Sequence, residues 1–150
     1  MILKEIEGGY EVKGVEILSG EAIIPSEYNG KPVIRIGESA FEGRNDLTKV
    51  IIPAGVKEIG RYAFGQCGSL KEVVLSEGLE SIGEHAFFGC YAIKRLEIPV
   101  SVTSVGEGAF EYWRQDQTIV VCGDFGRPPL GWSPNWLGKQ GDPVLDWYYA

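Results

Sequence analysis

Cysteine and histidine are the residue types whose number and spacing in this chain first suggest chemistry. Cys67 and Cys90 lie 23 residues apart, and the third cysteine is Cys122. Two thiols that a fold brings together form a disulfide or contribute to a zinc site. His85, the only histidine, would activate a thiol if the two side chains came within hydrogen-bond reach. The elements that position these residues decide between those possibilities.

A repeat of 23 residues positions them. The block (Ile/Val)-Gly-x-x-Ala-Phe occurs four times, with its glycines at Gly37, Gly60, Gly83 and Gly106. An alternating apolar block keeps the same register at residues 47–53, 70–76 and 93–99, and a third block repeats as Val56 and Ile59, Leu79 and Ile82, and Val102 and Val105. Such repeats are typical of solenoids, because one unit is too small to close a core and buries its apolar face against the next.

Each unit is predicted to contribute one short strand. Val50 and Ile52 alternate with residues of the opposite face, which is the period of a half-buried strand. Pro53 cannot donate to a sheet ladder and should end the strand. Stacked units would align these strands in a parallel sheet at about 4.8 Å spacing. The Ala-Phe pairs would then form a core ladder of Phe41, Phe64, Phe87 and Phe110, and the glycine before each pair would allow a turn or a close backbone approach.

At these residues the chain resembles the BspA-like leucine-rich repeats, also called the Treponema pallidum type. That repeat reads roughly L-x-x-(V/I)-x-(I/L)-P-x-x-(V/L)-x-x-I-G-x-x-A-F-x-x-C, and residues 47–113 follow it. Residues 24–37 resemble the family's common first repeat lengthened by five residues, and residues 129–136 with Pro143-Val144 resemble a closing motif. The chain departs from the pattern where a stack has to end: Arg44 and Trp113 replace cysteine, and Asp116 replaces an apolar residue.

The resemblance implies a right-handed repeat solenoid with short parallel β-strands, a 23-residue period and about four to five repeats. It would form a single leucine-rich repeat domain over residues 1–150. We expect residues 1–30 to form an N-terminal cap of short antiparallel strands and residues 31–113 to form the repeats. Residues 114–150 should hold a last strand, Thr118 to Cys122, and an irregular tryptophan-rich cap.

The solenoid argues against chemistry at the residues considered first. Cys67 and Cys90 would occupy one site in adjacent coils, close enough for a disulfide, but a buried ladder of free thiols is the favoured interpretation. His85 falls at a variable repeat position that is expected to be exposed, away from Cys90. The triplet Asp124-Phe125-Gly126 matches a kinase motif without its glycine-rich and catalytic loops. We expect no enzyme activity, no cofactor and no metal site.

Composition and charge exclude further classes. The chain has 14 Lys and Arg against 21 Asp and Glu, a scattered net charge of −7, which disfavours nucleic-acid binding. No stretch approaches the ~18 apolar residues of a membrane span, so membrane insertion is not expected. Residues 1–7 lack the features of a signal peptide. The chain is therefore expected in the cytoplasm unless a leader was removed, whereas the resemblance implies a surface or secreted protein.

The outward row of the predicted sheet is the candidate partner-binding face: Lys49, Ile51, Glu72, Val74, Arg95 and Glu97. Its alternating charges could simply stabilise neighbouring strands, and its β-branched residues suit a strand. Alternatively, Ile51, Val74 and Val120 form an apolar strip within a charged frame that binds a partner.

By resemblance we expect a non-catalytic protein-protein interaction module of bacterial surface or adhesion type, a monomer that binds an unidentified protein partner on this face. One alternative is a carbohydrate-binding module that uses the C-terminal aromatics Trp113, Trp132, Trp136, Trp147, Tyr148 and Tyr149. Burial of these rings over the open end of the solenoid is the favoured interpretation of them. A second alternative is an intracellular scaffold.

Overall fold

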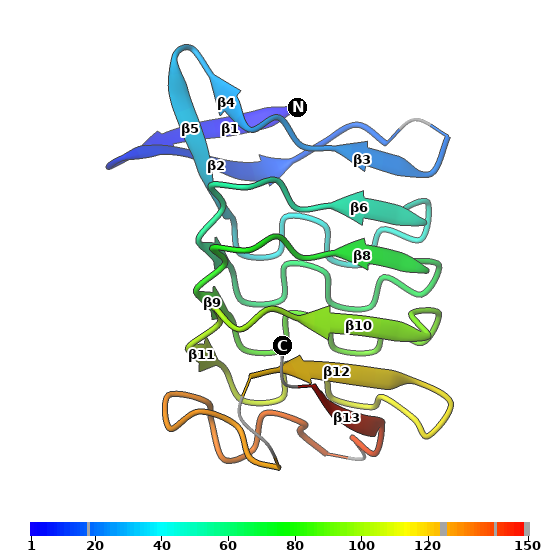
Figure 1. Ribbon diagram of the computed structural model, residues 1–150. Coiled ribbons are helices and arrows are strands. Elements are labelled where there is room, and N and C mark those ends of the chain that lie inside the picture. The colour runs from blue at the N-terminus through cyan, green and yellow to red at the C-terminus, as the bar shows by residue number, and fades with distance from the viewer. Residues whose placement is uncertain (18, 124–125, 140, 149–150) are drawn as a thin grey trace.

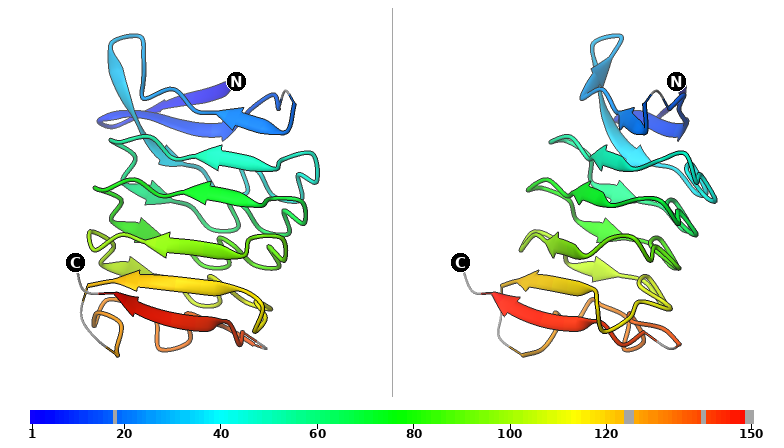
Figure 2. Two further views of the ribbon diagram at one scale, coloured as in Figure 1. Left: turned by 45° about the vertical axis from the view of Figure 1, so that its right-hand side comes forward. Right: turned by 90° about the vertical axis from the view of Figure 1, so that its right-hand side faces the viewer.

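The computed structural model describes residues 1–17, 19–123, 126–139 and 141–148, and the regular structure in this part of the chain is entirely β. The chain winds into a stack of coils, each advancing by one repeat (Figure 1). Two walls of short strands and a third side of turns enclose one core along the stack (Figure 2). Paired residues of successive coils lie 23 positions apart, as Lys49 and Glu72 do. The predicted solenoid of parallel strands is confirmed.

The first wall contains the strands that the alternating block predicted. Its members, in stacking order, are β3 (Glu21–Ile23), β6 (Lys49–Ile51), β8 (Glu72–Val74), β10 (Arg95–Ile98), β12 (Thr118–Cys122) and β13 (Val144–Tyr148). They form two parallel sheets, β3-β6-β8 and β10-β12-β13, and β10 follows β8 in the stack (Figure 1). The predicted strand from Thr118 to Cys122 is confirmed.

A second wall, which the sequence analysis did not predict, is built on the third block of the repeat. It consists of β1 (Ile2–Ile6), β2 (Gly9–Gly14), β5 (Lys31–Ile36), β7 (Glu58–Ile59), β9 (Ser81–Ile82) and β11 (Ser104–Val105), while β4 (Glu27–Tyr28) forms a hairpin with β5. From β2 onward its strands are parallel. Strands of two residues are too short to show the alternation by which a strand is recognised in a sequence.

Backbone hydrogen bonds between coils hold the third side together. The Phe41 N–H donates to the Ala63 carbonyl at 2.8 Å, and the equivalent bond has the same length in the next two coils. The residue two positions before each phenylalanine has a left-handed conformation, with φ values of 56° at Ser39, 57° at Tyr62, 54° at His85 and 63° at Gly108. The third side is therefore as regular as the walls, although it contains no strand.

The repeat glycines are needed because successive coils approach closely. A Cβ atom on Gly60 would lie 2.8 Å from the Glu38 nitrogen, and one on Gly83 would lie 2.7 Å from the Arg61 nitrogen. Neither glycine has a positive φ. Of the two roles predicted for them, close backbone approach is the one confirmed.

The core follows the predicted phenylalanine ladder. The four rings are fully buried and nearly parallel, with centroid separations of 5.0 Å for Phe41 and Phe64, 5.4 Å for Phe64 and Phe87, and 5.7 Å for Phe87 and Phe110. Apolar residues of both walls pack around the ladder, and the core is one continuous cluster.

The N-terminal end differs in one strand from the expected antiparallel cap. β1 pairs antiparallel with β2, but β3 pairs parallel with β6, so the prediction of antiparallel pairing is wrong for β3. The reason is visible in the sequence, since the residues that follow β3, Ile24-Pro25, match the Ile52-Pro53 that follows β6. β3 is the first rung of the first wall.

The C-terminal segment covers the end of the ladder. Trp136 is 5% exposed, and its ring meets Phe110 edge to face at 5.8 Å. The Gly108 N–H donates to the Asn135 carbonyl at 2.9 Å, so this segment replaces the missing next coil. The segment is not wholly irregular, because β13 adds a parallel rung to β12.

Candidate partner-binding face

The structure brings the six predicted face residues together on the outside of the first wall. Lys49 lies directly beside Glu72, and Ile51 directly beside Val74, across the pair of β6 and β8. Arg95 and Glu97 project from β10, where exposed and buried residues alternate. The face is therefore two parallel rows, one charged and one apolar toward the N-terminal end of the stack.

The charged row is satisfied by pairs within the wall. The Lys49 Nζ lies 3.6 Å from the Glu72 Oε2, and the Arg95 Nη2 lies 3.3 Å from the Glu97 Oε1. Exposed pairs of this kind stabilise a fold by at most about 1 kcal/mol. These ion pairs keep the charged row polar but hold its side chains only weakly. A polar row of this kind is suited to border an apolar contact surface.

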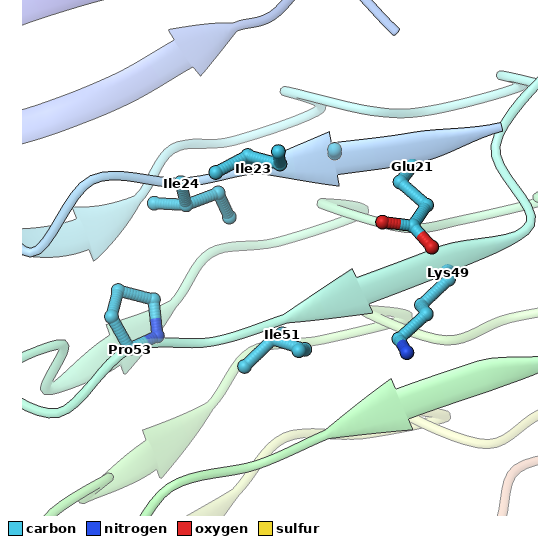
Figure 3. Close-up of a pocket in the computed structure, with 7 residues that line it drawn as sticks. Glu21, Ile23, Ile24, Lys49, Ile51 and Pro53 are labelled. Atoms are coloured by element: carbon cyan, nitrogen blue, oxygen red, sulfur yellow. The ribbon is translucent and has the colours of Figure 1, made fainter. Parts of the chain in front are cut away.

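The apolar row begins one strand earlier than predicted. Ile23 of β3 is paired with Ile51 and is 78% exposed, against 49% for Ile51 and 42% for Val74. Ile23, Ile51 and Pro53 line a hollow of about 210 Å³ between β3 and β6 (Figure 3). The signal that could have found Ile23 is the Ile-Ile-Pro shared by the ends of β3 and β6, which the longer first unit moved out of the 23-residue register.

Val120 does not belong to the exposed strip, although the sequence analysis placed it there. It is 2% exposed, and its direct neighbours in the sheet are Glu97 of β10 and Asp146 of β13. The repeat does not predict β13 as a further rung, so from the sequence Val120 is expected at the open end of the wall. The apolar part of the face is Ile23, Ile51 and Val74, which we call the apolar strip.

The two repeat cysteines form the expected row of buried free thiols. The Cys67 thiol donates to the Phe41 carbonyl at 3.1 Å, and the Cys90 thiol donates to the Phe64 carbonyl at 3.0 Å. Burial raises the pKa of Cys67 from 9.0 to about 11 and raises the pKa of Cys90 further. Both thiols are therefore neutral hydrogen-bond donors rather than nucleophiles.

The departures from the repeat continue this row of donors at its two ends. In the last coil the Trp113 indole N–H donates to the Phe87 carbonyl at 2.8 Å, and in the first coil the Arg44 guanidinium donates to the Val15 carbonyl at 3.1 Å. At the position where the repeat expects a buried apolar residue and the chain has Asp116, the next residue, Gln117, is buried instead. Its side-chain amide donates to two carbonyls of the preceding coil. Each substitution keeps a main-chain carbonyl hydrogen-bonded, and those bonded by Trp113 and Gln117 are buried.

His85 is not exposed, contrary to the prediction. Its side chain is 21% exposed, and its Nε2 lies 2.9 Å from the Glu111 Oε2. The ring stacks on Tyr62 of the preceding coil at 4.9 Å, because the repeat places one ring above the next. The Cys90 thiol is bonded elsewhere, so no thiol and imidazole pair forms. Among the described residues no cluster of histidine, cysteine and carboxylate side chains suits a metal ion.

The C-terminal tryptophans are mostly buried. Trp113, Trp132 and Trp136 are at most 5% exposed, and the Trp132 indole donates to the Val102 carbonyl at 3.2 Å. Trp147 is half-buried. Of the other residues considered in the sequence, Asp124, Phe125, Tyr149 and the side chain of Tyr148 lie outside what the structure describes. Three of the four tryptophans thus offer no open ring to a sugar.

A stack of near-identical coils with parallel walls, a ladder core and an exposed strand face defines a repeat-solenoid protein. The chain belongs to the BspA-type leucine-rich repeat family, whose model matches residues 30–125 with six copies.

Solved structures show the same fold. A leucine-rich repeat protein from Bacteroides capillosus is 38% identical, with 79% of this chain and 91% of that chain covered and a TM-score of 0.68. The Treponema pallidum leucine-rich repeat protein is 21% identical, with 93% and 78% covered and a TM-score of 0.61. A leucine-rich cell surface protein from Faecalibacterium prausnitzii is 23% identical, with 79% and 41% covered and a TM-score of 0.60. No curated protein matches the sequence. Within the described residues, no helix has the length and apolar character needed to cross a bilayer.

Proposed function

We propose that this protein is a non-catalytic interaction module that binds a protein partner on the outside of its first wall. The observation that supports this proposal is the apolar strip, which stays solvent-exposed on three consecutive hydrogen-bonded strands. Exposed apolar side chains that gather within a polar rim are typical of interaction sites. Family membership agrees, since leucine-rich repeat proteins are generally non-catalytic.

The ladder beneath the face gives the proposed site its rigidity. Ile51 follows buried Val50 in β6, and Val74 follows buried Val73 in β8; the two valines lie side by side over the core and hold the two strands in register. A surface held in one conformation loses little entropy when a partner binds. In this arrangement the apolar strip supplies contact area, while Lys49, Glu72, Arg95 and Glu97 set orientation and association rate.

We place the protein at the cell surface, in keeping with the description of the Faecalibacterium prausnitzii relative as a cell surface protein. A carbohydrate-binding role finds less support, because the tryptophans that would serve it are buried in the cap.

The test is the double variant Ile51→Asp with Val74→Asp. Both side chains point away from the core, so the variant should fold normally and lose at least tenfold in affinity, about 1.4 kcal/mol, for a partner isolated by affinity pull-down. The matched control is Val100→Asp with Leu130→Asp, which adds the same charges at exposed apolar residues outside the first wall. Unchanged partner binding by the first variant would show that the interface lies elsewhere.

A further inference from the structure

β3 has one unpaired edge in the first wall. It is the terminal strand of the sheet β3-β6-β8 and pairs, among the described strands, with β6 alone. The Gly20 carbonyl accepts from the Lys49 N–H at 3.2 Å, so Gly20 and Ala22 direct their backbone groups toward β6. Because alternate residues of a strand point their N–H and C=O to opposite sides, those of Glu21 and Ile23 point to the free edge.

An apolar hollow lies at the C-terminal end of this edge. It has a volume of about 440 Å³ and is lined by Met1, Leu3, Ile23, Pro25 and Tyr28. Met1, Ile23 and Tyr28 are between 44% and 78% exposed. β3 thus combines unpaired backbone groups with an open apolar hollow. A large apolar side chain of a strand added to this edge would be buried in that hollow.

An acidic hollow lies at the N-terminal end of the same strand. It has a volume of about 390 Å³ and is lined by Glu16, Ser19, Glu21 and Ile23. Neither glutamate forms an ion pair with another described residue. Lys49 is the cation nearest in register to Glu21 (Figure 3), but its ammonium group is paired with Glu72. The local charge is therefore negative, and a cationic side chain complements it.

We propose that the free edge of β3 accepts an extended segment of a partner protein, one that carries a basic residue and a large apolar residue about four positions apart. Backbone hydrogen bonds to Glu21 and Ile23 add the segment as a further strand. The spacing follows from the separation of the two hollows. Glu21 lines the acidic hollow and Pro25 lines the apolar one. These two residues are four positions apart, which corresponds to about 13 Å in an extended chain. Residues four apart in a strand also lie on the same side, so one segment fills both hollows.

This inference rests on the proposed function, because a segment bound at β3 brings its protein over the apolar strip that begins at Ile23. It adds the chemistry of the partner: a basic and apolar extended segment rather than a helix or an acidic chain. A partner strand parallel to β3 would continue the stacking order of the first wall.

The test selects a random-peptide display library on the full chain and measures the affinities of the recovered peptides by fluorescence anisotropy. Selected peptides should be enriched in Lys or Arg four positions from Leu, Ile, Phe or Met. Glu16→Gln with Glu21→Gln should weaken their binding at least tenfold at low salt and reduce its salt dependence. Recovery of peptides without this pattern, or of none, overturns the proposal.

A pair of variants at one position tests the backbone contact. Ile23→Ala and Ile23→Pro both remove the exposed side chain, but only proline removes the N–H that points to the free edge. Ile23→Pro should bind the selected peptides at least tenfold more weakly than Ile23→Ala, while circular dichroism and melting remain alike for the two. Equal affinities would show that the edge is not used. If the two variants melt differently, peptides N-methylated at single positions provide the same comparison on the ligand.

The two proposals fail separately. A partner that is lost with Ile51→Asp and Val74→Asp, but bound equally by Ile23→Ala and Ile23→Pro, supports the strip and overturns strand addition. A partner sensitive only to Ile23→Pro supports strand addition and overturns the strip.

Discussion

Replacing Phe87 by alanine tests the register of the whole stack. The ring is fully buried and lies between Phe64 at 5.4 Å and Phe110 at 5.7 Å. Truncating a buried phenylalanine costs about 3–5 kcal/mol, since the burial is lost and a cavity remains. Two lost aromatic pairs, each contributing about 0.5–1.5 kcal/mol beyond burial, place this variant toward the upper end.

Urea unfolding followed by circular dichroism measures this loss. In a chain of this size each kcal/mol lowers the melting temperature by about 2–4 °C, so the variant should melt roughly 10–20 °C lower. The m-value should stay the same if the stack unfolds as one unit.

Phe88→Ala is the matched control, because the neighbouring ring has the same chemistry but lies outside the ladder. Phe88 is half-buried and meets Tyr62, His85 and Tyr112 on the outside of the turns. We expect it to cost about 1–2 kcal/mol. A loss below about 1 kcal/mol for Phe87→Ala, or an equal loss in both variants, would refute the assigned ladder.

Four further predictions concern the same stack. Cys67 and Cys90 should react slowly with a thiol reagent in the native protein, and rapid labelling of both would contradict their burial. Because the folded pKa of Cys67, about 11, lies above its ordinary 9.0, its neutral thiol stabilises the fold fully below pH 9. This contribution, about 2–3 kcal/mol at 1.36 kcal/mol per pKa unit, is lost as the pH rises through 11, and Cys67→Ala should flatten the alkaline unfolding profile. Gly83→Ala should lower the melting temperature because its methyl group would press on backbone atoms of the preceding coil. Gly68→Ala is the control and should not lower it, because its methyl group would meet only a side-chain oxygen at 3.4 Å. Equal melting temperatures for the two variants would argue against close contact between coils. Trp113→Phe leaves a buried carbonyl without its donor and should cost about 1–3 kcal/mol in urea unfolding, a loss that would be absent if the indole bond were unimportant.

The sequence determined the features that depend on contacts between equivalent residues. A strict 23-residue spacing stacks every unit on the one before it. Phe64 therefore packs on Phe87, and Cys67 and Cys90 make the same hydrogen bond in adjacent coils. Strands β6, β8 and β10 followed from period-2 alternation, and the exposure of Ile51 and Val74 followed from the same alternation. Each of these statements needs only the repeat and local geometry.

The tertiary structure alone decided the shortest strands, the environment of the variable repeat positions and the ends of the stack. The two-residue strands of the second wall are stable only because neighbours pair with them on both sides, and pairing leaves no trace in so short a sequence. Ile23 joined the apolar strip because β3 pairs with β6 across a longer loop, and Val120 left the strip because β13 returns to flank β12. His85 became half-buried through a ring stacked from the coil before and a carboxylate of the coil after. The period that fixes equivalent residues does not apply to the ends, where each contact depends on how a non-repeating segment packs.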